Sequence, residues 1–391
     1  MKVLQLYNGY RLAVHGEEWV VNSTDRLLKQ HGVEATLLKA GNLGFDAGVG
    51  AKALAALQSI YSVTSARTVA GLLAGNRPDV VHAHNLYPRL SPSVLVACRK
   101  ARVATVLTAH SYFLTCPVTT HLNAGRICTK CVGGREQHCV IDNCRGNRVE
   151  SLVYAVRSAI AGRLGLYRDN VSLVVALCEF GRQFLIDAGF APGRIVVLPN
   201  AVPMPPEPTT AGRGGYVAFA GRLAPVKGVD ILIEAARRTG IPVRLAGDPS
   251  TFAHDRSSLP DNVEFAGLLA GDELQKFYAG ARFLVFPSRW FEMCPIVILE
   301  AMSHGLAVVA SRIGGLGELV EHGVSGLLFE AGNPGALAEA MQRLWDAPQE
   351  CARLGAAGRE AVRQRHDQAG YFDRLIEAYQ RAVALGFPVP A

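Results

Sequence analysis

The sequence predicts an α/β protein built from two doubly wound domains that face each other across a cleft. Short runs rich in Val, Ile and Leu alternate with helical stretches along most of the chain, which is typical of a parallel sheet covered by helices. This alternation stops at 202–215, where Pro, Gly and Thr predominate, and then restarts. The length of 391 residues suits two domains, each able to bury a core.

Residues 1–201 are expected to form the first domain. Its strands are predicted from short apolar runs bounded by polar or turn residues. They are expected at Lys2–Tyr7, Ala35–Lys39, Val80–His84, Thr105–His110, Leu173–Leu177 and Ile195–Leu198. Helices are expected between them, at Glu17–His31, Ala51–Leu73, Pro92–Arg102, Val149–Leu166 and Phe180–Ala188.

Residues 216–365 are expected to form the second domain, joined to the first by a linker at 202–215. Its strands are expected at Tyr216–Ala220, Val243–Ala246, Val263–Phe265, Phe283–Phe286, Ala307–Ala310 and Gly326–Phe329. The tail from Pro334 onward is expected to be helical in three pieces, with residues 366–391 containing the last helix.

The net charge of +7 is unevenly distributed. Through Arg194 the chain has 22 Lys and Arg against 12 Asp and Glu, whereas the remainder has 18 against 21. No basic cluster is interleaved with aromatic residues and no nucleic-acid-binding module is present, which argues against nucleic acid as a partner. A basic first half leaves two interpretations, a merely basic surface or contact with an anionic membrane.

No apolar run reaches the length of a membrane span, and the N-terminus lacks a signal-peptide pattern. We therefore expect a cytoplasmic protein, with peripheral contact at the inner face of the membrane as a further interpretation.

The stretch 285–311 has the features of a ligand site at the mouth of a helix. A buried strand is followed by a loop that contains Glu292, and Pro295 is expected as the first helical residue because that position needs no N–H donor. Glu300 lies in the second turn, and Gly305 ends the helix. A helix N-terminus binds anions, while a carboxylate suits hydroxyl groups. The combination predicts a ligand with both phosphate and hydroxyls, as in a nucleotide sugar.

The loop after the first strand of the second domain contains two cations five residues apart. Arg222 and Lys227 can clamp a diphosphate, and Gly228 permits close approach of the backbone. No Asp-x-Asp pair, which would hold a divalent ion, occurs in the chain. We therefore predict that the site needs no metal ion or other cofactor for catalysis, because the fixed cations can take the place of a divalent ion.

These motifs resemble those of retaining glycosyltransferases with the GT-B fold, glycosyltransferase family 4, which have a Glu-x7-Glu motif. The branch with a five-cysteine insertion is most similar, through its Pro-Ser-x-Trp-x-Glu-x-x-Pro pattern. That pattern is matched by Pro287, Ser288, Trp290, Glu292 and Pro295. The resemblance extends over nearly the whole chain and implies two Rossmann-like domains, with the last helix crossing back to the first domain.

The resemblance also implies roles for residues of the second domain. Glu292 would bind hydroxyls of the donor sugar as one of the catalytic residues, and Glu300 would hold the ribose. Backbone N–H groups of Cys294, Ile296 and Val297 would meet the sugar and the β-phosphate. Arg222 and Lys227 would neutralise the diphosphate as the sugar leaves.

Three further positions are assigned by the same resemblance. His110, at the end of a strand in the first domain, would contact the transferred sugar beside the reacting carbon, although Ser111 replaces the aspartate usual in the family. Gly16 would let the first loop approach the donor, and backbone groups near Leu268 would hold the base.

Five cysteines fall between the strand ending at His110 and the next long helix. They are Cys116, Cys128, Cys131, Cys139 and Cys144, within an insertion at 116–144. Cys128-x-x-Cys131 has the spacing of a zinc knuckle. Structural zinc is the favoured interpretation, and reduced thiols, a disulfide or an iron–sulfur cluster are the alternatives. The insertion is expected to act as a lid or to shape the acceptor site.

The sequence thus predicts a retaining hexosyltransferase of polysaccharide or glycoconjugate biosynthesis. Its donor is a nucleotide-diphosphate sugar, and its acceptor is a glycan, a lipid-linked molecule or a small molecule. The alternatives are a nucleotide-sugar epimerase of the same fold and a degenerate module that binds a sugar or nucleotide. Against the second, His110, Arg222, Lys227, Glu292 and Glu300 are all present together.

Overall fold

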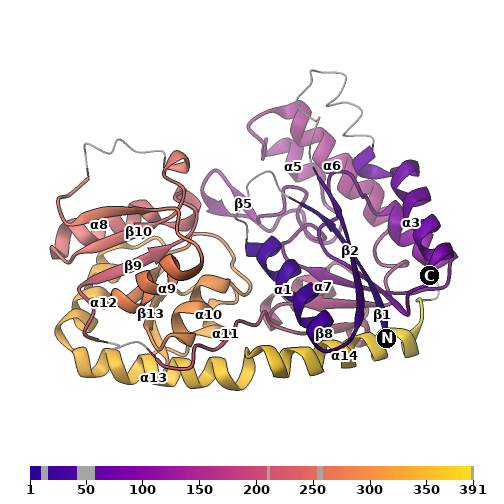
Figure 1. Cartoon of the computed structure of the whole chain (residues 1–391). Coiled ribbons are helices and arrows are strands. Elements are labelled where there is room, and N and C mark those ends of the chain that lie inside the picture. The colour runs from indigo at the N-terminus through magenta and orange to yellow at the C-terminus, as the bar shows by residue number, and fades with distance from the viewer. Residues whose placement is uncertain (10–15, 42–57, 209–211, 253–258, 389–391) are drawn as a thin grey trace. The chain divides into compact units, whose positions relative to one another are not determined.

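The computed structural model describes residues 1–9, 16–41, 58–208, 212–252 and 259–388. The chain divides into two compact units, of which the first comprises Met1–Leu198 with Phe372–Ala391 and the second comprises Pro199–Tyr371. Each unit contains a parallel six-stranded sheet with helices packed on it (Figure 1). The predicted fold class, two Rossmann-like α/β domains, is confirmed.

The sheet of the first unit has the strand order β2-β1-β3-β4-β7-β8. The strands are β1 (Lys2–Asn8), β2 (Glu34–Ala40), β3 (Val80–Ala83), β4 (Ala104–Ala109), β7 (Leu173–Ala176) and β8 (Ile195–Val197). The helices are α1 (Gly16–Gln30), α3 (Val63–Gly75), α4 (Ser93–Lys100), α5 (Gln137–Ile141), α6 (Arg148–Arg163) and α7 (Glu179–Asp187). A short antiparallel hairpin of β5 (Leu122–Asn123) and β6 (Arg126–Ile127) lies in the cysteine-rich insertion.

The sheet of the second unit has the order β11-β10-β9-β12-β13-β14. The strands are β9 (Tyr216–Ala220), β10 (Val243–Ala246), β11 (Val263–Gly267), β12 (Ala281–Phe286), β13 (Ala307–Ser311) and β14 (Gly326–Phe329). The helices are α8 (Val229–Thr239), α9 (Gly271–Gly280), α10 (Ile296–Ser303), α11 (Leu316–Leu319), α12 (Pro334–Asp346) and α13 (Pro348–Arg365).

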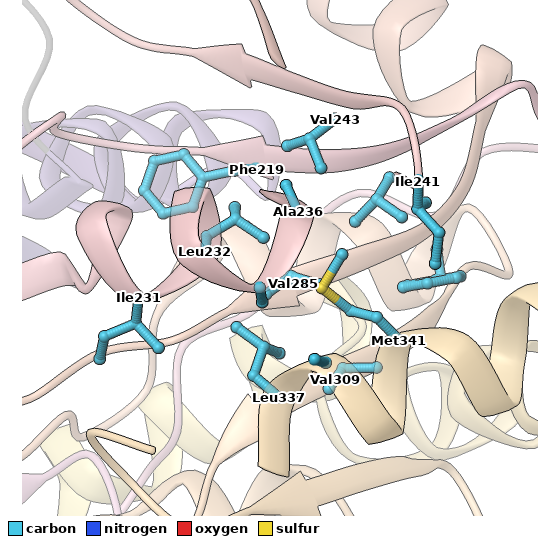
Figure 2. Close-up of a cluster of buried hydrophobic side chains, with 14 of the residues drawn as sticks. Phe219, Ile231, Leu232, Ala236, Ile241, Val243, Val285, Val309, Leu337 and Met341 are labelled. Atoms are coloured by element: carbon cyan, nitrogen blue, oxygen red, sulfur yellow. The ribbon is translucent and has the colours of Figure 1, made fainter. Parts of the chain in front are cut away.

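Helices α8 and α12 pack on one face of the second sheet. Leu232 and Ala236 of α8 and Met341 of α12 lie against Val285 and Val309 of the central strands (Figure 2). All five side chains are almost completely buried. Burial on this scale, at about 1.5–3 kcal/mol for each large aliphatic side chain, fixes the strand ends from which the site loops emerge.

The last helix, α14 (Gln368–Leu385), starts at the end of the second unit and belongs to the first unit from Phe372 onward. In the first unit its Tyr379 hydroxyl bonds His82 Nδ1 at 2.8 Å, and its Phe372 ring stacks on His31 at 4.1 Å between centroids. The helix is therefore part of the core of the first unit.

Two sequence-based expectations for helices are corrected. Pro295 precedes α10 in extended conformation, with ψ of 125°, and the helix begins at Ile296. The long helix expected at Ala51–Leu73 is broken, because Ser62 is extended and its Oγ accepts a hydrogen bond from the Ser65 amide, which starts α3 at Val63. Residues 51–57 of that expected helix lie outside the described part of the chain.

Candidate functional site

Glu292 lies in the loop between β12 and α10, and one of its oxygens is the acceptor for three donors. Oε1 receives hydrogen bonds from Lys227 Nζ at 2.6 Å, from Ser288 Oγ at 2.8 Å and from the indole N–H of Trp290. The side chain is buried. Three donors on one buried oxygen hold the carboxylate in a fixed position, so its other oxygen has a defined direction for a ligand hydroxyl.

The backbone of Glu292 is held as firmly as its side chain. The Gly315 amide donates to the Glu292 carbonyl at 2.7 Å. Gly314 adopts φ of +57°, and a Cβ there would lie 2.6 Å from the Glu292 carbonyl oxygen. Only glycine fits such a close approach, so the pair Gly314-Gly315 fixes the backbone position of the Glu292 loop.

The two predicted cations, Arg222 and Lys227, both lie over the Trp290 ring. Lys227 Nζ lies 4.7 Å from a Trp290 ring centroid, and the Arg222 guanidinium lies 5.7 Å from it. The loops meet because Gly228, with φ of +72°, sits against Pro287, whose carbonyl oxygen would be 1.8 Å from a Cβ at this position. The direct ion pair of Lys227 with Glu292 is a feature that the sequence did not predict.

A second ion pair joins the loop after β12 to the first turn of α8, and a backbone hydrogen bond joins the same loop to the loop after β9. Arg289 Nη2 lies 2.6 Å from Asp230 Oδ2, and the Arg289 amide donates to the Val226 carbonyl at 2.9 Å. The loop after β9 and the loop after β12 are therefore one connected platform, with Arg222, Lys227 and Glu292 fixed on it.

The first amides of α10 form the next part of the site. Ile296 and Val297 occupy the first turn, where backbone N–H groups have no partner within the helix. Cys294 precedes them, and its carbonyl accepts a hydrogen bond from Asn200 Nδ2 at 2.8 Å. Asn200 thereby fixes the entry of the chain into α10, a role that the sequence did not indicate.

Glu300 lies one turn further along α10, and the hydroxyl of Tyr278 donates to its Oε2 at 3.1 Å. Tyr278 is fully buried. Burial raises the pKa of Glu300 from 4.5 to about 7, against the opposing effect of the tyrosine hydrogen bond. Glu300 is therefore poised to change its protonation state near neutral pH.

Glycines at the carboxyl ends of three neighbouring strands bring the remaining loops together. Gly247 after β10 donates its amide to the Gly267 carbonyl at 2.8 Å, and a Cβ on Gly247 would lie 2.1 Å from the Gly221 carbonyl oxygen. Leu268 follows directly and is half exposed. Backbone groups next to Leu268 are thus presented at the edge of the sheet where ligands bind in open α/β folds.

His110 follows β4 in the first unit and belongs to a stack of three histidines. His84 Nδ1 lies 2.9 Å from His110 Nε2, and the two rings stack with centroids 5.2 Å apart. His82 lies behind, bonded to Thr108 Oγ1 at 2.7 Å. Burial lowers the pKa of His82 to about 3 and that of His84 well below its usual value, so both rings are neutral.

The sequence indicated His110 and missed its neighbours. The signal available in the sequence was the pair His82 and His84 in and directly after the apolar strand β3, because buried polar rings require hydrogen-bond partners. Gly16, the other predicted residue of this unit, is the first residue of α1. The loop before it, residues 10–15, lies outside the described part of the chain.

Solved structures share this architecture. The Anabaena protein HepE, solved with UDP and glucose, is 20% identical, with a TM-score of 0.67 over 97% of this chain and 99% of that one. A sucrose-phosphate synthase from Thermosynechococcus elongatus is 17% identical, with a TM-score of 0.71 over 98% and 100% of the two chains. At this level of identity the likeness shows the fold.

Two family models divide nearly the whole chain between them. "Glycosyl transferase 4-like domain" matches residues 15–201, and "Glycosyl transferases group 1" matches residues 214–347. Both domains therefore match glycosyl transferase models, and the chain has the GT-B fold.

Curated relatives of this chain are similar over part of their length. An uncharacterized glycosyltransferase of Methanocaldococcus jannaschii is 36% identical over 153 residues, 38% of this chain and 43% of the relative. The D-inositol 3-phosphate glycosyltransferase of Salinispora tropica is 33% identical over 199 residues, 44% of this chain and 39% of the relative. The matched region is thus less than half of either relative.

The cysteine insertion packs as a small core of its own. Cys131 and Cys139 are buried together with Ala155, and Cys144 packs against them. Burial, with neighbouring thiols adding to it, raises the pKa of Cys131 and of Cys139 to about 12. Within the described part of the chain, no two cysteines form a disulfide.

Among the described residues, no group of three His, Cys, Asp or Glu side chains is arranged to hold a metal ion. Structural zinc in the insertion therefore stays a prediction. Within the same residues, no helix combines the length and apolar character needed to cross a membrane.

Proposed function

We propose that this chain is a retaining glycosyltransferase that moves a hexose-type sugar from a nucleotide-diphosphate sugar to an acceptor hydroxyl. Its biosynthetic setting would be polysaccharide or glycoconjugate synthesis. The observation that supports this best is the fixed Glu292 carboxylate, held by Lys227, Ser288 and Trp290 beside the Arg222 guanidinium. Hydroxyl acceptors and diphosphate-binding cations side by side match the two ends of a sugar diphosphate.

In this proposal, Glu292 binds hydroxyls of the donor sugar, and the α10 amides of Ile296 and Val297 meet the β-phosphate. Arg222 and Lys227 neutralise the diphosphate as it leaves, which is the main electrostatic demand of the reaction. Glu300 accepts hydrogen bonds from the ribose hydroxyls. HepE, which shares the fold, was solved with UDP-glucose, in keeping with a donor of this class.

The transfer occurs on one face of the sugar. The bond between the anomeric carbon and the β-phosphate oxygen breaks, and a bond to the acceptor oxygen forms from the same side. The acceptor proton passes to the leaving phosphate oxygen, so the configuration is retained without a protein nucleophile. His110, held by His84 at 2.9 Å, contacts the sugar beside the reacting carbon.

Catalysis is proposed to be independent of metal, because the cations and helix amides supply the positive charge that a divalent ion would otherwise provide. An epimerase of the same fold is not favoured, since both family models that match the chain describe glycosyl transferases. A degenerate binding module would bind nucleotide without transferring sugar.

Substitution of the fixed carboxylate tests the proposal. Glu292→Gln keeps the shape of the side chain but removes its charge, so sugar transfer should fall by on the order of a hundredfold or more. Transfer is measured as nucleotide diphosphate released in the presence of acceptor. The matched control, Glu339→Gln, changes an exposed glutamate of α12 in the same unit and should leave transfer unchanged. Full activity of the Glu292→Gln variant would refute the assigned site.

A further inference from the structure

Exposed aliphatic side chains are concentrated in one part of the first unit. Six of the large hydrophobic residues that are exposed in the described chain lie between Ile127 and Leu164. On α6, Val149 is 72% exposed, Leu152 51% and Val156 41%. In the part of the chain that the structure describes, these side chains are left largely exposed, so their apolar character calls for another explanation.

The exposed residues of α6 follow the helical period. Val149, Leu152 and Val156 are spaced three and four residues apart, and the half-buried Val153 and Ile160 fill the same face. We call these five residues the α6 apolar stripe. The opposite face of the helix, which includes Ser151, Ala155 and Ala161, is buried in the first unit. The described part of the chain thus buries one face of the helix and leaves the α6 apolar stripe largely exposed.

Arginines flank the α6 apolar stripe at both ends. Arg145 and Arg148 are exposed at its N-terminal end, and Arg163 is exposed at its C-terminal end. Between Arg126 and Leu164 the chain has seven Lys and Arg residues and three Asp and Glu residues. This local excess continues the basic character of the first 194 residues, which contain 22 cationic and 12 anionic side chains.

We propose that the α6 apolar stripe docks this glycosyltransferase on an anionic lipid bilayer. The aliphatic side chains enter the boundary between headgroups and acyl chains, and the flanking arginines contact lipid phosphates. A helix of 16 residues is suited to lie in the plane of the interface. A second copy of this chain fits the surface less well, because a symmetric contact would bring the same arginines together.

Binding to vesicles tests the proposal on the whole chain. Wild-type protein should co-sediment with vesicles of equal parts phosphatidylcholine and phosphatidylglycerol, less well with pure phosphatidylcholine, and less well at high ionic strength. The triple variant Val149→Ser, Leu152→Ser, Val156→Ser should bind the anionic vesicles at least about tenfold more weakly. The triple variant keeps every charge, so its loss would be assigned to the apolar stripe.

A matched control uses exposed aliphatic residues elsewhere in the first unit. Val63 and Leu72 of α3 are 53% and 39% exposed, and the variant Val63→Ser, Leu72→Ser should bind as the wild type does. Unchanged melting of both variants would show that they fold. Equal binding of the triple variant and the wild type, or no binding by the wild type, would overturn the proposal.

Sedimentation in the absence of lipid tests the alternative that a second copy of this chain covers the α6 apolar stripe. If the wild type is an oligomer that the triple variant converts to a monomer, the stripe is an interface between copies, and the membrane proposal is wrong. None of these measurements depends on sugar transfer, so their outcome is separate from that of the proposed function.

Discussion

The buried Glu300 carboxyl lowers the stability of the folded protein at pH values where it is ionised. Burial raises the pKa of this carboxyl from 4.5 to about 7, so between these values the folded state keeps a proton that the unfolded chain has lost. The free energy of unfolding therefore falls as the pH rises through this window. Above neutral pH, the pKa shift of Glu300 lowers the free energy of unfolding by on the order of 3 kcal/mol.

The variant Glu300→Gln cannot ionise and still offers an oxygen to the Tyr278 hydroxyl. We expect it to be more stable than the wild type at about pH 8, and the difference to shrink towards pH 5. Urea unfolding at both pH values measures this, with Glu339→Gln on the exposed face of α12 as the control. A stability difference that does not change with pH would contradict the assignment.

The residues of the proposed donor site were predicted from sequence motifs and from the family resemblance, but their direct contacts were not. Lys227 and Glu292 are 65 positions apart, and nothing in the sequence requires the ion pair between them. It arises because Gly228 admits the Pro287 carbonyl, which brings the two loops into contact. His84 and Asn200 were missed for a related reason, since each acts by holding a residue from a distant part of the chain.

At the scale of elements, the strands were the most predictable. The ends of the predicted strands lie within one or two residues of the expected positions, because most of these strands are short apolar runs and the central ones are buried on both faces. Helix starts were less predictable, as Ser62 and Pro295 show, since a cap depends on backbone conformation. The cysteine insertion was least predictable, because Gly125, Gly133 and Gly134 take left-handed conformations and no periodic pattern spans it.

The prediction that the cysteine insertion binds structural zinc can be tested directly. If it binds structural zinc, purified protein should contain zinc in stoichiometric amount, and removal by a strong chelator should lower the melting temperature by several degrees or more. Cys128→Ser should lower the zinc content, whereas Cys351→Ser, in the buried core of the second unit, should not. Protein that contains no zinc and melts unchanged with chelator would defeat the zinc prediction.

At the scale of the whole molecule, the two parallel sheets and the division into two units could be predicted from alternation and length. The part of α14 that begins at Phe372 belongs to the first unit, although it follows the second unit in sequence. The charge asymmetry was visible in the sequence, but the α6 apolar stripe was not. In the sequence, the residues of the stripe look like ordinary core positions of a helix. Only the structure shows that the buried face of α6 is a different one.

The proposed function depends on whether the second unit binds a nucleotide diphosphate without metal. The most direct measurement is thermal shift with UDP, GDP, ADP, dTDP and their hexose conjugates, in the absence of added metal. We expect one diphosphate to raise the melting temperature of the wild type, and Arg222→Ala to lose that shift. The control Arg237→Ala, on the exposed part of α8, should keep it. No shift with any nucleotide, or an undiminished shift in Arg222→Ala, would contradict the account.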